Sequence, residues 1–148
     1  EAVIAGLLVG VAWIATDPAA AAASPLGAWL ASQGTGVAVL WLLVRVIGSG
    51  ITVPIAEELA FRGMLARWII GRDFTAVDYA RLTLPAMAIS SVLFGLMHER
   101  WIAGALAGLV FALVAQRTRS LAGAVVAHMA ANLVICAWAL VFRQWSLL

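Results

Sequence analysis

Three short stretches of the chain combine residue types that can carry out acid–base chemistry. They read EELAFRG at 57–63, FGLMH at 94–98 and HMAAN at 128–132. The chain as a whole is 65% hydrophobic and only 11% charged. Ionisable groups are costly in apolar segments and are usually retained for a function. The two histidines, the one adjacent pair of acids and the single asparagine all fall in these stretches.

The first stretch predicts two different roles for its two acids. On a helix Glu58 and Arg62 are four residues apart and can pair, whereas Glu57 is rotated by about 100° and points elsewhere. A carboxylate held by a guanidinium stays ionised and structural, while one left in an apolar cavity becomes a better general base. The alternative is a helix start whose acids complement the helix dipole and whose arginine snorkels to the membrane surface.

The other two stretches each place two side chains one turn apart on a helix face. Phe94 precedes His98 by four residues, and His128 precedes Asn132 by four. Taken alone, His98 ends an apolar stretch before Glu99 and Arg100 and is more typical of a membrane interface than of a catalytic site. His128 and Asn132 could also be polar contacts between helices, each worth roughly 0.5–2 kcal/mol.

Together these groups form a set that can hydrolyse an acyl bond. An inward glutamate, two histidines and an asparagine supply a base for water, a partner that positions the water and donors for an oxyanion. The sequence has no G-x-S-x-G motif, and its one cysteine, Cys136, lies in an apolar stretch. Activated water is therefore favoured over a covalent nucleophile.

Two alternatives remain open at this point. One is a zinc-dependent membrane protease with Glu57, His98 and His128 as metal ligands, although the H-E-x-x-H motif is absent. The other is a non-enzymatic membrane scaffold or immunity-type binding protein, in which the same polar groups only hold helices together.

The elements that must position these residues are membrane helices. The apolar runs do not alternate with period two, so the sequence predicts an all-α, polytopic transmembrane helix bundle of about five or six helices and not a barrel. The glycines of Gly48 to Gly50 are expected to loosen or break the backbone, and those of Gly104 to Gly108 to allow close packing. We expect main helices at Ala2 to Ala15, Gly36 to Ile47, Ile51 to Ile70, Leu82 to His98, Trp101 to Gln116 and Leu121 to Phe142, with a surface helix carrying Trp29 in the stretch 18–36.

Arginines cluster in two loops, which the positive-inside rule assigns to the cytoplasm; we expect no nucleic-acid binding. At about 1.5 Å per residue, straight helices would place His128 too far from Glu57 and His98. A short fourth helix, a bend at Gly48 to Gly50, or a loop at Arg117 to Arg119 sunk into the protein would close the gap.

The order of the motifs resembles that of a known family. E-E-x-x-x-R, F-x-x-x-H and H-x-x-x-N form the motif series of the CAAX protease and bacteriocin-processing (CPBP) family of intramembrane glutamic endopeptidases, and the resemblance covers residues 48–148. It implies that Glu57 is the general base and that His98 helps to hold the water. It also implies that His128 and Asn132 stabilise the oxyanion. Glu58, Arg62 and Phe94 then have supporting roles, and no metal or other cofactor is expected.

A narrower resemblance is to the protease portion of exosortase E/protease fusions. It rests on the spacing before the second motif and on a start at Glu1 without methionine. It implies that residues 1–148 are one membrane-embedded protease domain, a fragment of a longer chain with an upstream exosortase-type domain. The expected location is the bacterial inner membrane. The expected partners are membrane lipid and a membrane-anchored protein with a hydrophobic C-terminal segment.

Overall fold

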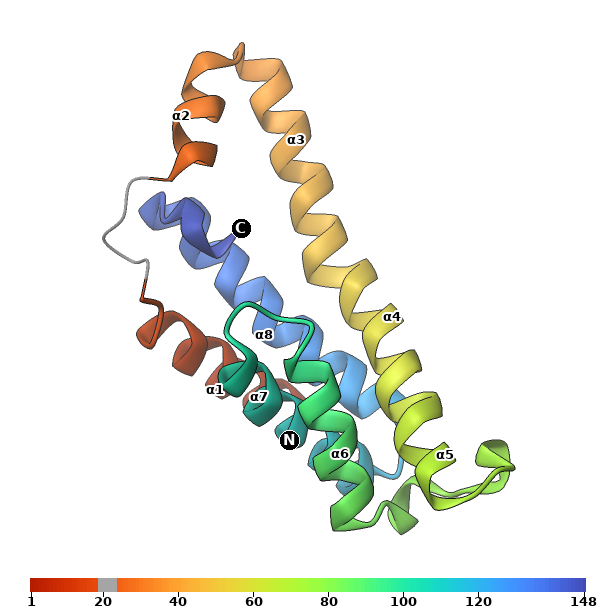
Figure 1. Ribbon diagram of the computed structural model, residues 1–148. Helices are drawn as coiled ribbons and strands as arrows, with labels where there is room; N and C mark the ends of the chain where they lie inside the picture. The colour runs from red at the N-terminus through yellow and green to blue at the C-terminus, as the bar shows by residue number, and fades with distance from the viewer. Residues whose placement is uncertain (19–23) are drawn as a thin grey trace.

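The computed structural model describes residues 1–18 and 24–148, and all regular structure within them is helical (Figure 1). The predicted all-α bundle is confirmed. The helices are α1 Ala2–Ala15, α2 Pro25–Ser32, α3 Thr35–Ile47, α4 Val53–Glu58, α5 Ala66–Ile70, α6 Leu84–Gly95, α7 Trp101–Thr118 and α8 Leu121–Phe142. Since α3, α4 and α5 are parts of one continuous helix, Thr35–Ile70, the described chain has six helices.

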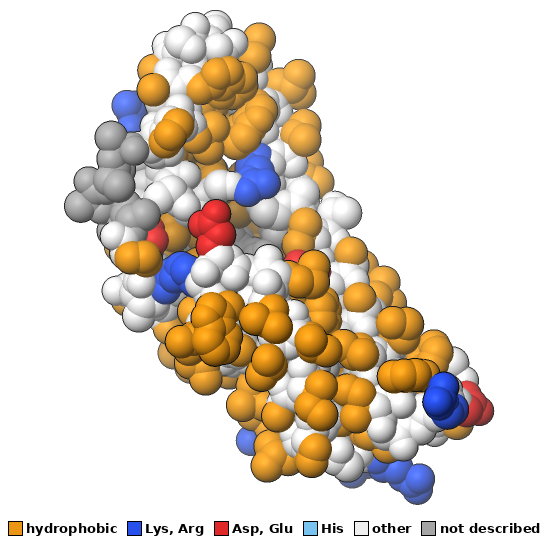
Figure 2. Space-filling view, in the orientation of Figure 1, with side chains coloured by type: hydrophobic (Ala, Val, Ile, Leu, Met, Phe, Trp, Pro, Cys, Tyr) orange, Lys and Arg blue, Asp and Glu red, His pale blue; other side chains and the backbone are white. Residues whose placement is uncertain are grey.

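Three helices in the described part of the chain are long and apolar enough to cross a membrane: Thr35–Ile70, α7 and α8. The apolar helices α1 and α6 are shorter. Hydrophobic side chains cover much of the face seen in Figure 2, while charged side chains lie at its lower end and around a hollow. This distribution is that of an integral membrane protein.

The long helix runs through its glycines without a break. Gly48–Thr52 and Leu59–Leu65 are π-helical turns, η1 and η2, inserted into the α-helix. The sequence prediction of a loosened backbone at Gly48–Gly50 is confirmed, but the alternative of a break there is wrong. The second π turn starts directly after Glu58 and contains Arg62. Such turns are frequent at functional sites because they change the direction of the side chains that follow.

Small residues bring the helices close together, as expected for packing in a membrane. A Cβ atom on Gly6 of α1 would overlap the backbone of Ala127 in α8. On α7, a Cβ on Gly104 would lie 3.1 Å from the Gly95 Cα of α6, and one on Gly108 would lie 2.7 Å from Arg62 Nη2. The predicted packing role of the Gly104 to Gly108 stretch is confirmed.

The predicted surface helix is α2, which carries an exposed Trp29; residues 19–23 of the same stretch lie outside the described part. The helix expected at Leu82 to His98 is shorter than predicted. The twelve residues of α6 rise only about 18 Å, so His98 follows its end in a turn. Phe94, in the last turn of α6, contacts both His98 and His128. Residues of the second and third motifs thus come into contact, and α6 is shorter than the helix expected there.

Candidate active site

A fully buried ion pair lies at the centre of the bundle. Arg62 Nη1 donates to Glu58 Oε1 at 3.1 Å, and neither side chain is exposed. Arg62 Nη2 also donates to the Gly108 carbonyl of α7. The pairing predicted from the four-residue spacing is therefore present. The bond from Arg62 to the Gly108 carbonyl joins the long helix to α7.

The same glutamate also binds a histidine from a distant part of the chain. His128 Nδ1 lies 3.0 Å from Glu58 Oε1, and the imidazole is buried. Because a carboxylate paired with a guanidinium is ionised and only accepts, Nδ1 carries the proton. Glu58 therefore fixes the orientation of His128 through its Nδ1 side.

Glu57 lies on the other side of the same imidazole. Its Oε2 is 3.8 Å from His128 Nε2, and its side chain is 18% exposed, whereas that of Glu58 is 0% exposed. Oε2 itself is buried and has no hydrogen-bond partner among the described residues. The two adjacent acids differ in their partners: Glu58 Oε1 pairs with both Arg62 and His128, whereas no hydrogen bond engages the Oε2 atom of Glu57 that lies nearest His128. Glu58 Oε2 is likewise buried and without a hydrogen-bond partner among the described residues.

Aromatic rings surround these polar groups. Phe94 lies 4.6 Å from the Arg62 guanidinium, 4.7 Å from the His98 ring and 5.7 Å from the His128 ring. Phe111 of α7 stacks on His128 at 4.5 Å with an interplanar angle of 18°. These contacts pack against the Arg62 guanidinium and hold both imidazoles in place.

His98, His128 and Asn132 line one cavity of about 300 Å³. His98 Nδ1 donates to the Phe94 carbonyl at 2.9 Å, which leaves Nε2 of the neutral ring as an acceptor. Asn132 Nδ2 donates to the Ser49 carbonyl of the first π turn at 2.7 Å. No described hydrogen bond or ion pair joins His98 or Asn132 to Glu57, and neither Glu57 nor Glu58 lines this cavity. The acids are connected to it through His128, which lines the cavity and lies beside both of them.

Some residues of this site were not identified from the sequence. Phe111 lies in an apolar stretch with no distinguishing pattern, and its contact with His128 depends on how α7 packs on α8. Ser49 and Arg45 also line the cavity, and Arg45 donates to the Leu148 carbonyl. An arginine inside an apolar stretch is the one signal that could have pointed to this wall.

A zinc site needs at least three ligand side chains close together, and the described residues do not supply them. In residues 1–18 and 24–148, no three His, Cys, Asp or Glu side chains come together as a metal-ligand set. Glu57, His98 and His128 are therefore not gathered as the three-ligand set that the zinc alternative requires.

Comparison with known proteins identifies the family. The model of the family described as Type II CAAX prenyl endopeptidase Rce1-like matches residues 39–134. The chain belongs to this family. Searches of curated proteins and of solved structures found no match.

The match contains all three motifs, from Glu57 to Asn132, but excludes α1 and α2. Together with the apolar helices, it makes the chain a CAAX-type endopeptidase of the membrane.

Proposed function

We propose that this endopeptidase cleaves a peptide bond near the membrane with water activated by Glu57. One observation carries the proposal: Glu57 Oε2 is buried, has no hydrogen-bond partner among the described residues and lies 3.8 Å from His128 Nε2. A water beside this oxygen could give its proton to the carboxylate and attack the substrate carbonyl. Glu58 is less suited to this role, because Arg62 and His128 hold its Oε1 and its side chain is 0% exposed, against 18% for Glu57.

The other residues supply positioning and charge stabilisation in this mechanism. His98, with Nε2 available as an acceptor, helps to hold the attacking water. His128 in its doubly protonated form donates from Nε2 to the oxyanion, and Asn132 exchanges its bond to Ser49 for one to the same oxygen. Glu57 then returns the proton to the leaving amine. Arg62, Glu58 and Phe94 keep the arrangement rigid.

The test is a charge-neutral substitution of Glu57. Glu57→Gln should lower the cleavage rate by about 100-fold or more, the size expected for loss of a general base, while insertion and thermal stability stay unchanged. Glu1→Gln, at an exposed carboxylate, is the matched control and should cleave at the wild-type rate. If Glu57→Gln cleaves at the wild-type rate, the glutamate mechanism is wrong.

A chelator series separates this mechanism from zinc chemistry. The proposal expects that cleavage continues after dialysis against a strong chelator. Activity that is lost there and restored by zinc, with one metal bound per chain, would favour the zinc protease. A folded wild type that cleaves nothing would favour the scaffold or binding protein.

The proposed substrate is a membrane-anchored protein with a hydrophobic C-terminal segment, and the proposed location is the bacterial inner membrane. An upstream exosortase-type domain is part of the same proposal. Substrates can be found by comparing the membrane proteins of cells that carry the full-length wild type with those of cells that carry Glu57→Gln. True substrates acquire a new peptide end only with the wild type.

A further inference from the structure

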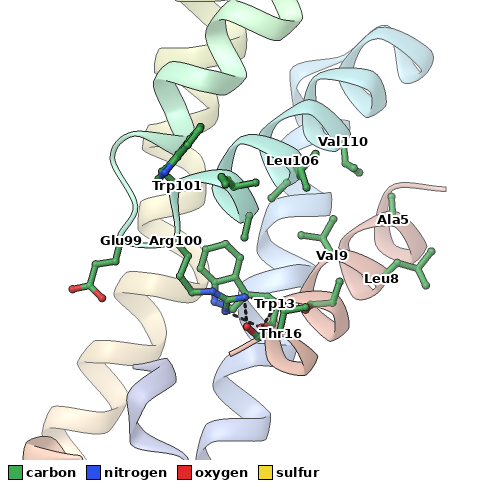
Figure 3. A pocket seen from close by; sticks show the side chains of 14 residues that line it. Ala5, Leu8, Val9, Trp13, Thr16, Glu99, Arg100, Trp101, Leu106 and Val110 are labelled. Atoms are coloured by element: carbon green, nitrogen blue, oxygen red, sulfur yellow. Dashed lines mark hydrogen bonds between the residues drawn. The ribbon is translucent and has the colours of Figure 1, made fainter. Parts of the chain in front are cut away.

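A second and larger cavity lies outside the candidate active site. It is a groove of about 750 Å³ between α1 and α7. Figure 3 shows Leu8 and Val9 of α1 across from Leu106 and Val110 of α7. Leu8 is 67% exposed and Leu106 is 61% exposed, so both edges of the groove face the lipid.

The polar groups that line the groove lie at one end, where Arg100 is hydrogen-bonded to Trp13 and Thr16. Arg100 donates from Nη1 to the Trp13 carbonyl at 2.9 Å and from Nη2 to the Thr16 carbonyl at 2.8 Å and to the Thr16 hydroxyl (Figure 3). Its guanidinium also lies 4.6 Å from the Trp13 ring. Since Glu99 adds a carboxylate beside this end, a phosphate headgroup would meet repulsion and few spare donors. The groove fits an uncharged, apolar chain.

The groove adjoins the cavity lined by His98, His128 and Asn132, which is called the catalytic cavity below. Val9, Trp13 and Ala107 line both cavities. The Trp13 ring also meets the His98 ring edge-on at 6.0 Å, with an interplanar angle of 70°. One indole thus forms the wall between a lipid-facing groove and a proposed catalytic histidine.

We propose that this groove binds the apolar, membrane-embedded segment of the protein substrate and directs the adjoining peptide bond past Trp13 to His98. The inference rests on the function proposed above. The occupant is assigned as substrate because the groove faces the bilayer at Leu8 and Leu106 and shares one wall with the catalytic cavity. A segment bound in the groove therefore lies next to the Trp13 ring, which contacts His98.

The experiment places a larger side chain in the groove from each of its two walls. Leu106→Trp on α7 and Leu8→Trp on α1 are compared with Leu113→Trp, which is on α7 one heptad further, faces lipid and does not line the groove. Full-length protein is reconstituted in vesicles. Two probes are used: a membrane-anchored substrate identified through Glu57→Gln, and a soluble peptide of about ten residues that spans its cleaved bond.

Leu106→Trp and Leu8→Trp should each raise KM for the membrane-anchored substrate about tenfold with little change in kcat. Cleavage of the soluble peptide should stay at the wild-type rate, and Leu113→Trp should change neither reaction. Affinity measured on the uncut substrate, in a Glu57→Gln background, should fall by the same factor.

Unchanged KM in both groove variants would overturn the inference and leave the groove to bilayer lipid. An equal loss for both probes would also overturn it, because the damage would then lie in the catalytic cavity. If Glu57→Gln cleaves normally, the proposed mechanism fails independently of any groove result.

Discussion

At the scale of single residues, Glu58 joins two of the three motif-bearing helices, the long helix through Arg62 and α8 through His128. The four-residue spacing predicts its pairing with Arg62, and this pair is present. The bond to His128, seventy residues away, could not be predicted, since it depends on how α8 packs against the long helix. The sequence assigned Glu57 and Glu58 to different environments, and their different exposure and partners agree with that division.

Replacing Arg62 with methionine should strongly destabilise the fold. Arg62→Met leaves the Glu58 carboxylate buried without its counter-charge, at an expected cost of about 3–5 kcal/mol in the free energy of unfolding. Unfolding in mixed micelles titrated with sodium dodecyl sulfate measures this cost.

The double variant Glu58→Gln/Arg62→Met is the control for that measurement. It should lose less stability than the sum of the two single changes, because the uncompensated charge is removed. Strict additivity would contradict the pairing.

At the scale of elements, helix positions followed well from the sequence, but their internal irregularities did not. The predicted bounds of α1 and α8 match the structure, since Asp17–Pro18 ends the first and a short polar turn separates α8 from α7. The π turn η2 carries no such signal in its own sequence. Its formation depends on contacts with neighbouring helices, so the final direction of Arg62 could not be predicted.

The closest approach of α6 and α7 gives a prediction at this scale. A Cβ on Gly95 would lie 2.6 Å from the Ala105 backbone nitrogen, so Gly95→Ala must push the two helices apart. We expect a loss of about 1–3 kcal/mol in stability and a parallel fall in activity, because Phe94 and His98 flank this glycine.

Gly36→Ala is the matched control, since no atom lies within 4 Å of its added Cβ. It should be neutral or slightly stabilising in the same unfolding titration. Equal losses in the two variants would show that crowding at the α6–α7 contact is not the cause.

At the scale of the whole molecule, α1 lies outside the family match yet completes the cavity. It packs against α8 through Gly6 and Gly10, and its last turn is tied to the start of α7 by Arg100. The sequence located α1 but gave no reason to connect it with the active site. That connection depends on Trp13, whose position only the packed bundle determines.

Arg100→Ala should release the end of α1 from the rest of the bundle. The loss of charge-assisted hydrogen bonds to the Trp13 and Thr16 carbonyls predicts about 1–2 kcal/mol lower stability. Hydrogen exchange of the backbone amides in the last turn of α1 should become faster. Arg117→Ala, which removes only an exposed ion pair with Glu1, should leave both readouts unchanged.

The short helix α6 has a consequence for the surrounding bilayer. Its twelve residues rise about 18 Å, whereas the hydrocarbon layer of a membrane is about 30 Å thick. If α6 crosses the hydrocarbon layer, we expect the lipids that border it to compress, or polar headgroups and their hydration to follow the helix end inward. Acyl-chain length thereby becomes a physical control on hydration around His98, and vesicles of graded lipid thickness would tune turnover without any change to the protein.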